Sequence, residues 1–254
     1  MLDRRFLLRK FRPARYTAQL VCQGRNADAL TILRERRLGY AAMEWRTRLP
    51  MPCHTIVDAG AHTGEVSAAL DFAFRPARIL AIEANPVRAA GLRSRFAARP
   101  HIRVTAVALA ENKGTLPFFI QDFDAASSLF QLREGYLASL GLPEGNRRIE
   151  VPAQRLEQVV ADAGIAEVDL LKLDCQGAEL RILQGAGDLL RRIRHIYTEV
   201  TFEPIYAQGA QFHELHAFLR SAGFRLAQLH ADDAERGSIS QGDALYVRGD
   251  ASLP

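Results

Sequence analysis

The chain has 254 residues, of which 48% are apolar and 24% charged, and this suits a globular protein with a sizeable core. No apolar run reaches the roughly 18 residues that a membrane-spanning helix needs, so we expect no transmembrane segment. The basic N-terminus, MLDRRFLLRKFRPARY, lacks the apolar centre of a signal peptide. The three widely separated cysteines, Cys22, Cys53 and Cys175, suit reduced thiols, and we therefore expect a cytoplasmic protein.

The formal net charge of +4 is unevenly distributed. Residues 1–48 hold 12 Lys and Arg against 4 Asp and Glu, a balance of +8, whereas the remainder holds 21 against 25, a balance of −4. This basic segment could contact an acidic partner, a membrane surface, nucleic acid or a second copy of the chain, or it could be a solvated helical face. No basic and aromatic residues alternate there as in RNA-binding motifs, so no nucleic-acid partner is expected.

The elements predicted before residue 51 are helical. Residues 27–38 have apolar residues at helical spacing, with Asn26 as a possible N-cap, and Pro50 and Pro52 mark a boundary. We therefore expect two parts, a basic helical N-terminal extension over 1–50 and a larger domain over 51–254.

From residue 51 onward, predicted strands and helices alternate, which indicates a mostly parallel sheet in an α/β fold. The strands are expected at 55–59, 78–83, 102–109, 169–174 and 195–200, and the helices at 64–74, 86–98, 177–191 and 210–222. Residues 114–154 interrupt this alternation with two further strands, near 114–120 and 148–152, around a long polar loop. A C-terminal strand pair, 224–230 and 244–248, completes the sheet.

The first strand leads into a glycine-containing turn that predicts a cofactor site. Asp58 ends the buried run and is followed by Gly60, His62 and Gly64. A dinucleotide-binding turn has the pattern G-x-G-x-x-G, but here His62 replaces the second glycine and position 65 is not a glycine. S-adenosylmethionine (SAM) carries no phosphate and is cationic, so it tolerates a bulkier turn and an adjacent acid. The turn therefore favours SAM over a nicotinamide dinucleotide.

Glu83 supports the same interpretation. It stands at the tip of the second strand, where an acid accepts hydrogen bonds from the ribose hydroxyls of an adenosine cofactor. The alternative is that Glu83 caps the helix that begins at Asn85-Pro86.

A second constellation lies at Asp169-Leu-Leu-Lys-Leu-Asp-Cys-Gln-Gly-Ala-Glu179, where a buried strand ends at Asp174. Ligands of such sheets bind beyond the carboxyl ends of the strands, so Asp174 is expected near the transferred group. Glu179, in the first turn of the next helix, and Glu199, at the end of the next strand, lie on the same rim. These three acids are the candidate catalytic residues, as a general base or as Mg²⁺ ligands. Acids in a divalent site cluster more tightly, so we assign no metal.

These residues resemble the FkbM family of SAM-dependent methyltransferases. The similarity covers roughly residues 54–230 and is carried by the following motifs: Val57-Asp-Ala-Gly-Ala-His-Thr-Gly64, Glu83-Ala-Asn-Pro86, Ala106-Val-Ala-Leu109, Ser127-Ser128, Val168 to Glu179, Leu183-Gln-Gly-Ala186 and Glu199-Val200. His62 departs from the Asn that such families often have there.

The resemblance implies a class I methyltransferase, Rossmann-like sheet and methylation of a hydroxyl oxygen on a small molecule or glycan. We assign Asp58, Gly60, His62, Gly64, Glu83, Ala84, Ala108 and Asp174 to SAM binding. Ser127 and Ser128, in the long loop, are assigned to substrate binding. His213 and His216 are weaker candidates for the base. Two alternatives remain, a nicotinamide-dependent oxidoreductase and a non-catalytic protein that binds a partner through its basic N-terminus.

Overall fold

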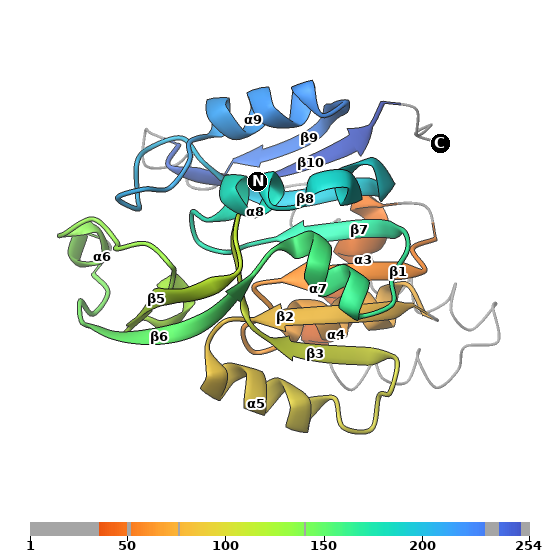
Figure 1. Ribbon diagram of the computed structural model, residues 1–254, viewed down its shortest axis with the longest axis horizontal. Coiled ribbons are helices and arrows are strands. Elements are labelled where there is room, and N and C mark those ends of the chain that lie inside the picture. The colour runs from red at the N-terminus through yellow and green to blue at the C-terminus, as the bar shows by residue number, and fades with distance from the viewer. Residues whose placement is uncertain (1–35, 50–51, 76, 140, 232–238, 250–254) are drawn as a thin grey trace, which may run out of the picture. The chain divides into compact units, whose positions relative to one another are not determined.

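The computed structural model of the protein describes residues 36–49, 52–75, 77–139, 141–231 and 239–249 (Figure 1). Within these ranges the chain forms two compact units, one from residues up to 54 together with 64–77, and one from residues 55–63 and 78–249. None of the helices in this described part is long and apolar enough to cross a membrane. The expected helix over 27–38 and the N-cap Asn26 lie almost wholly outside it, and the division at residue 50 stays a prediction.

The first unit contains two helices, α3 (Arg36–Arg48) and α4 (Glu65–Ala73). In α3, Ala42 and Trp45 are buried, and the guanidinium of Arg46 lies 5.6 Å from the centre of the Phe74 ring, just after α4. The apolar residues of α4 are buried along its length, which is the reason the sequence pattern predicts this helix well.

The second unit is built on a seven-stranded sheet with the strand order β3-β2-β1-β7-β8-β10-β9. Its strands are β1 (Thr55–Ala59), β2 (Arg78–Glu83), β3 (Ile102–Ala106), β7 (Val168–Leu173), β8 (Ile193–Thr201), β9 (Phe224–Ala231) and β10 (Gln241–Arg248). The pairs from β3 through β8 are parallel, and β10 runs antiparallel to both β8 and β9. The strands are β-branched and leucine-rich runs buried on both faces, as a parallel sheet requires. The predicted class I methyltransferase sheet is confirmed.

The helices of this unit are α5 (Pro86–Arg95), α7 (Leu156–Asp162), α8 (Glu179–Gln184) and α9 (Phe212–Ser221), with the short α6 (Tyr136–Ser139) and the 3₁₀ turns η1 (Asp124–Ala126) and η2 (Gly187–Arg192). The local sequence explains where α5 begins. The Asn85 side chain accepts hydrogen bonds from the amides of Val87 (3.0 Å) and Arg88 (3.4 Å), with Pro86 at the first helical position.

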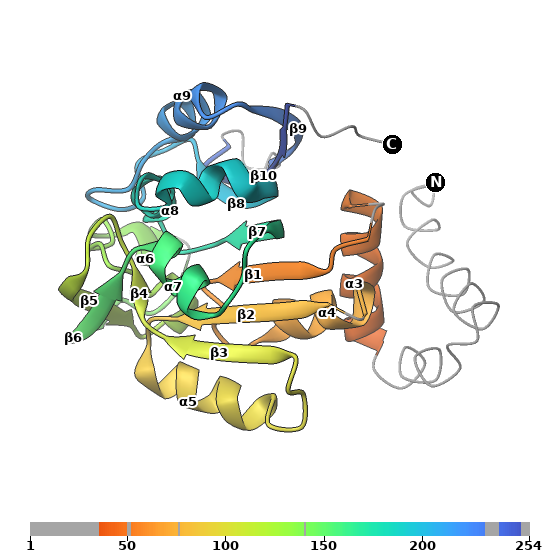
Figure 2. The same cartoon turned by 45° about the vertical axis from the view of Figure 1, so that its right-hand side comes forward.

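A small second sheet lies at the carboxyl ends of the first strands. It consists of β4 (Ala108–Leu109), β5 (Gly114–Gln121) and β6 (Asn146–Gln154), in the order β4-β6-β5. In Figure 2 the arrowheads of β1, β2 and β3 point toward the side where β5 and β6 lie. The insertion that interrupts the alternation is therefore next to the edge where ligands bind in such folds.

Two predicted elements have the wrong bounds, and one helix was missed. The strand expected at 102–109 is divided at Val107, whose amide donates to Glu83 O at 3.1 Å, and its last two residues join the second sheet. The helix expected at 177–191 is α8 followed by η2, and Gly177 precedes it with a φ of 94°. Helix α7 was not predicted.

Candidate functional site

The candidate site is a cavity beyond the carboxyl ends of β1, β2 and β7. The strand order changes direction between β1 and β7, and such a switch point is where open α/β sheets bind ligands. The cavity is lined by Gly60, His62, Ile82, Glu83, Ala84, Asn85, Arg88, Val107, Ala108, Leu109, Phe118, Asp124, Ala125, Ser127, Leu129, Asp174, Cys175, Gln176, Ala178 and Ile182.

The structure thus brings many of the predicted residues to one cavity, but not all. The assigned residues on its wall are Gly60, His62, Glu83, Ala84, Ala108, Asp174 and Ser127. The wall does not include Asp58, Ser128, Glu179 or Glu199. Gly64, with a φ of 79°, caps α4 and belongs to the first unit.

Gly60 is required by the close approach of two chain segments. Its φ is 77°, and a Cβ at this position would lie 1.9 Å from the backbone oxygen of Asp174. The amides of Gly60 and Ala61 both donate to Ile82 O at 3.0 Å. The turn after β1 is thereby fixed against the ends of β2 and β7, and only glycine allows it.

Lys172 connects Asp58, which lies in β1, with Asp174, which follows β7. Its Nζ lies 3.3 Å from Asp58 Oδ1 and 3.4 Å from Asp174 Oδ2, and it donates to Gly60 O at 3.2 Å. Burial alone would lower the pKa of Lys172, but the carboxylates of Asp174 and Asp58 outweigh burial and hold that pKa above its ordinary value. Asp58 is completely buried, so it supports the turn from beneath the cavity.

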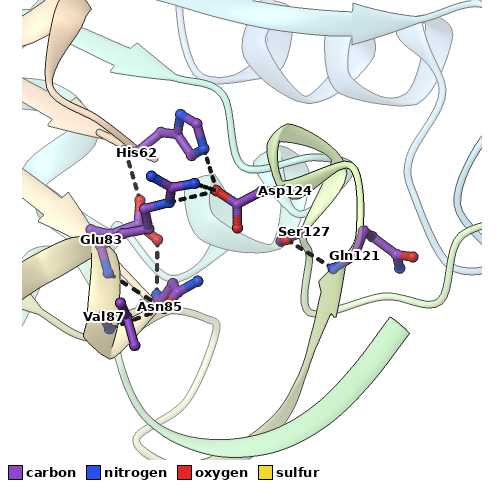
Figure 3. Close-up of polar contacts among 8 residues, drawn as sticks. His62, Glu83, Asn85, Val87, Gln121, Asp124 and Ser127 are labelled. Atoms are coloured by element: carbon purple, nitrogen blue, oxygen red, sulfur yellow. Dashed lines mark hydrogen bonds and ion pairs between the residues drawn. The ribbon is translucent and has the colours of Figure 1, made fainter. Parts of the chain in front are cut away.

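Glu83 lines the cavity, and two backbone amides hold its carboxylate. Its Oε2 accepts the His62 amide and its Oε1 accepts the Asn85 amide, both at 2.8 Å (Figure 3). Burial raises the pKa of Glu83, and the two amide hydrogen bonds partly offset that effect. A carboxylate has about four acceptor positions. Two therefore remain for hydroxyl groups of a ligand, and the proposed helix-capping role is absent because the Asn85 side chain caps α5.

His62 adopts a left-handed backbone conformation, with a φ of 47°. Asn and His adopt this region more readily than most residues, which explains why His can occupy a position where Asn is common. Its ring Nε2 lies 2.7 Å from Asp124 Oδ2, and Arg88 pairs with the same carboxylate oxygen. No sequence pattern marks Arg88 and Asp124 as partners, because 36 residues separate them.

The two serines of the long loop differ in role. Ser127 lines the cavity, and its Oγ accepts the Gln121 amide at 3.1 Å. Ser128 is buried; its Oγ donates to Gln176 O at 2.7 Å and accepts the Phe130 amide at 3.0 Å. The Ser128 hydroxyl is therefore engaged in holding the loop, and Ser127 is the serine that lines the cavity.

The three candidate catalytic acids lie together, and Gln176 joins two of them. Gln176 Nε2 donates to Asp174 Oδ1 at 2.7 Å and to Glu199 Oε2 at 3.2 Å. Its Oε1 accepts the Tyr206 hydroxyl at 2.7 Å. Gln176 itself has a φ of 55°, so its backbone is held in an unusual conformation beside the cavity.

Burial raises the pKa values of two of these acids, Glu179 and Glu199. Burial raises the pKa of Glu179 to about 7, against hydrogen bonds from backbone amides such as that of Cys175 (2.7 Å). Burial, with the nearby charges of Asp174 and Glu179, raises the pKa of Glu199 well above its ordinary range. The Asp174 side chain is 41% exposed and lies on the cavity wall, so it is the acid that a ligand can reach.

The later histidines lie away from the cavity wall. His213 is exposed, and His216 Nδ1 lies 3.0 Å from the Tyr246 hydroxyl while its ring stacks on Phe212. Among the residues that the structure describes, no cluster of three or more His, Cys, Asp or Glu could hold a metal ion.

The methyltransferase FkbM domain model matches residues 58–226, which is more than half of the chain. The chain belongs to the FkbM methyltransferase family. It is 30% identical over 195 residues to the 31-O-demethyl-FK506 methyltransferase FkbM of Streptomyces tacrolimicus, covering 68% of this chain and 73% of that protein. It is 27% identical over 166 residues to the 2-O-methyltransferase NoeI of Sinorhizobium fredii, covering 62% and 68%.

This FkbM-family chain also aligns with the crystal structure of magnesium protoporphyrin IX methyltransferase from Synechocystis PCC 6803. The alignment covers 98% of each chain, at 11% identity and a TM-score of 0.46. The fold assignment rests on the strand order of the sheet and not on this alignment. As a family member the chain is a SAM-dependent methyltransferase, and the nicotinamide alternative is not favoured.

Proposed function

We propose that the protein transfers the methyl group of SAM to a hydroxyl oxygen of a small molecule or glycan. The oxygen acceptor is supported by the relatives, whose names describe a 2-O-methyltransferase and an enzyme acting on 31-O-demethyl-FK506. The observation that carries the proposal is that one cavity is lined both by Glu83, the acid proposed to bind the ribose, and by the exposed acid Asp174.

Glu83 and the turn at Gly60 are the proposed cofactor-binding elements. The two unused acceptor positions of the Glu83 carboxylate suit two adjacent ribose hydroxyls. Ala84 and Ala108 supply small apolar surfaces on the same wall, as a flat purine ring requires. Asp58 acts through Lys172, which holds the Gly60 carbonyl, and does not itself reach the cavity. These residues fit an adenosine-containing ligand.

Asp174 is the proposed catalytic residue. Bound SAM supplies a methyl group on a sulfonium, which is already activated for transfer. The remaining task is to align the acceptor oxygen and accept its proton, and a positioned base contributes roughly 10²–10⁴-fold to the rate. Of the three candidate acids, Asp174 alone lines the cavity, with a 41% exposed side chain.

Gln176 and Lys172 hold the Asp174 carboxylate in place. Gln176 contacts Oδ1 at 2.7 Å and Lys172 lies 3.4 Å from Oδ2, so both oxygens are positioned from the protein side. Glu179 and Glu199 lie behind this pair and are proposed to tune the charge around it rather than to touch the acceptor. Ser127, which lines the same cavity, is the proposed hydroxyl contact for the acceptor.

The test is product identification. The purified protein is incubated with SAM carrying a labelled methyl group and a panel of sugars and hydroxylated small molecules, and methylated products are analysed by mass spectrometry. We expect a labelled methyl ether, lost in Asp174→Asn. A product methylated on nitrogen, sulfur or carbon would contradict the proposal. A partner for the basic N-terminus, self-association and a cytoplasmic location stay predictions.

A further inference from the structure

The carboxylate of Asp124 joins segments that are far apart in the sequence. Asp124 begins η1, in the loop after β5; its Oδ2 lies 2.7 Å from Nε2 of His62, in the turn after β1, and pairs with Arg88 on α5. Figure 3 shows the Asp124 carboxylate directed toward the His62 ring, across from the labelled Ser127. The three side chains are 23–40% exposed, and all three line the cavity.

The same loop is anchored separately at its base. The Gln121 amide donates to Ser127 Oγ at 3.1 Å, and Phe119 and Ser128 exchange backbone hydrogen bonds of 2.8 and 3.1 Å. These contacts close residues 122–127 into a compact projection from β5. Asp124, together with Ala125 and Ser127 of this projection, forms part of the cavity wall. The base of the projection is held by its own strand and by the Asp122 amide, which donates to Gly145 O at 2.7 Å, and the Tyr206 hydroxyl lies 3.2 Å from Ala126 O. Asp124 holds the tip to the turn after β1 and to α5.

His62 connects this tip to Glu83, the acid proposed to bind the ribose. Its backbone amide donates to Glu83 Oε2, while its ring contacts Asp124. One residue in a left-handed conformation thus supports the Glu83 carboxylate with its main chain and the loop with its side chain. A cofactor held by Glu83 would occupy the cavity that the projection helps to line.

We propose that Asp124 is a cofactor-positioning residue, which latches residues 122–127 over the Glu83 end of the cavity through His62 and Arg88. The inference rests on the proposed function, because it takes the Glu83 end as the cofactor site. Hydrogen bonds that involve ionised groups are stronger than neutral ones, so loss of the shared carboxylate releases the tip. Release opens the wall without removing the Glu83 contacts.

The first experiment needs no ligand. Hydrogen exchange is measured on the free protein, the Asp124→Ala and Asp124→Asn variants, and Glu134→Ala as a control. Glu134 is an exposed acid in the same insertion. We expect the amides of residues 123–127 to exchange about tenfold faster in both Asp124 variants, the factor that about 1.4 kcal/mol corresponds to. The amides of β1 and β2 should be unchanged. Unchanged exchange at 123–127 would overturn the latch even if the cofactor assignment is correct.

The second experiment follows release of S-adenosylhomocysteine by stopped-flow displacement. We expect Asp124→Ala to raise the dissociation rate constant about tenfold and to leave the association rate constant within about threefold. His62→Asn keeps a residue that tolerates positive φ but loses the ring, and Arg88→Met loses the cation. Each should raise the dissociation rate in wild type and have no further effect in the Asp124→Ala background.

The outcomes separate the two hypotheses. Failure of the wild-type protein to bind S-adenosylhomocysteine would refute the proposed function. Binding by wild type with an unchanged dissociation rate in both Asp124 variants would refute the latch alone. Weaker binding that comes wholly from a slower association rate would also refute it. So would fully additive effects of Arg88→Met and Asp124→Ala on the dissociation rate.

Discussion

Removal of the Glu83 carboxylate should affect both stability and cofactor binding, because the same group serves the fold and the ligand. Its oxygens accept the amides of His62 and Asn85 at 2.8 Å, and the residue is 7% exposed. Hydrogen bonds to a charged group are worth about 1.5–3 kcal/mol each. Burial raises the pKa of Glu83 and so offsets part of that gain. We expect Glu83→Ala to lower the free energy of unfolding by about 2 kcal/mol.

The same substitution should weaken the binding of S-adenosylhomocysteine by about 1.5–3 kcal/mol, or roughly 10- to 150-fold in Kd. Urea unfolding followed by circular dichroism measures the first effect, and titration calorimetry measures the second. Glu150→Gln is the control, since Glu150 is exposed and its ion pair with Arg148 should contribute less than about 1 kcal/mol. A stable Glu83→Ala protein with an unchanged Kd would refute the reasoning.

The remaining predictions concern the turn and the acids. Gly60→Ala should lower the free energy of unfolding by more than about 3 kcal/mol, because of strain at positive φ and collision with Asp174 O. Gly91→Ala in α5, where a Cβ meets no atom within 4 Å, should raise it by about 0.5–1 kcal/mol. Chemical denaturation compares the two variants. Asp174→Asn should reduce turnover about 10²–10⁴-fold in a protein that circular dichroism shows to be folded, and wild-type activity would exclude it as the base. The pKa of Glu179 rises from 4.5 unfolded to about 7 folded, so its unfavourable contribution is absent below about pH 4.5 and complete above pH 7. Glu179→Gln should therefore remove a decrease of about 3 kcal/mol in stability between those pH values, and an identical pH profile in urea titrations would contradict this.

Much of the fold was predictable because the central strands are short, apolar and bounded by turn residues. The strand 55–59 and the strand 78–83 have the bounds expected from the sequence. The break at Val107 was not predictable from hydrophobic periodicity, because the apolar pattern continues through it into β4. Helix α7 could have been found, since Leu156, Val159 and Val160 are spaced as one helical face and are buried.

The site was predictable where it follows the ends of strands, and less so where it depends on the insertion. Glu83 and Asp174 each stand at a strand tip, so the topology alone places them near one another. Asp124 and Arg88 meet only through the tertiary path of the loop after β5, and no local pattern marks either residue. Glu179 and Glu199 are close to Asp174 as expected, but Glu179 is buried, Glu199 is half-buried, and neither lines the cavity.

The most direct test of the cofactor assignment is calorimetric titration of the purified 254-residue protein with S-adenosylhomocysteine, with NAD⁺ as the control ligand. We expect micromolar binding of S-adenosylhomocysteine and no binding of NAD⁺, because the wall beside Glu83 suits an adenosine while the turn after β1 lacks a dinucleotide pattern. Binding of NAD⁺ without binding of S-adenosylhomocysteine would contradict it.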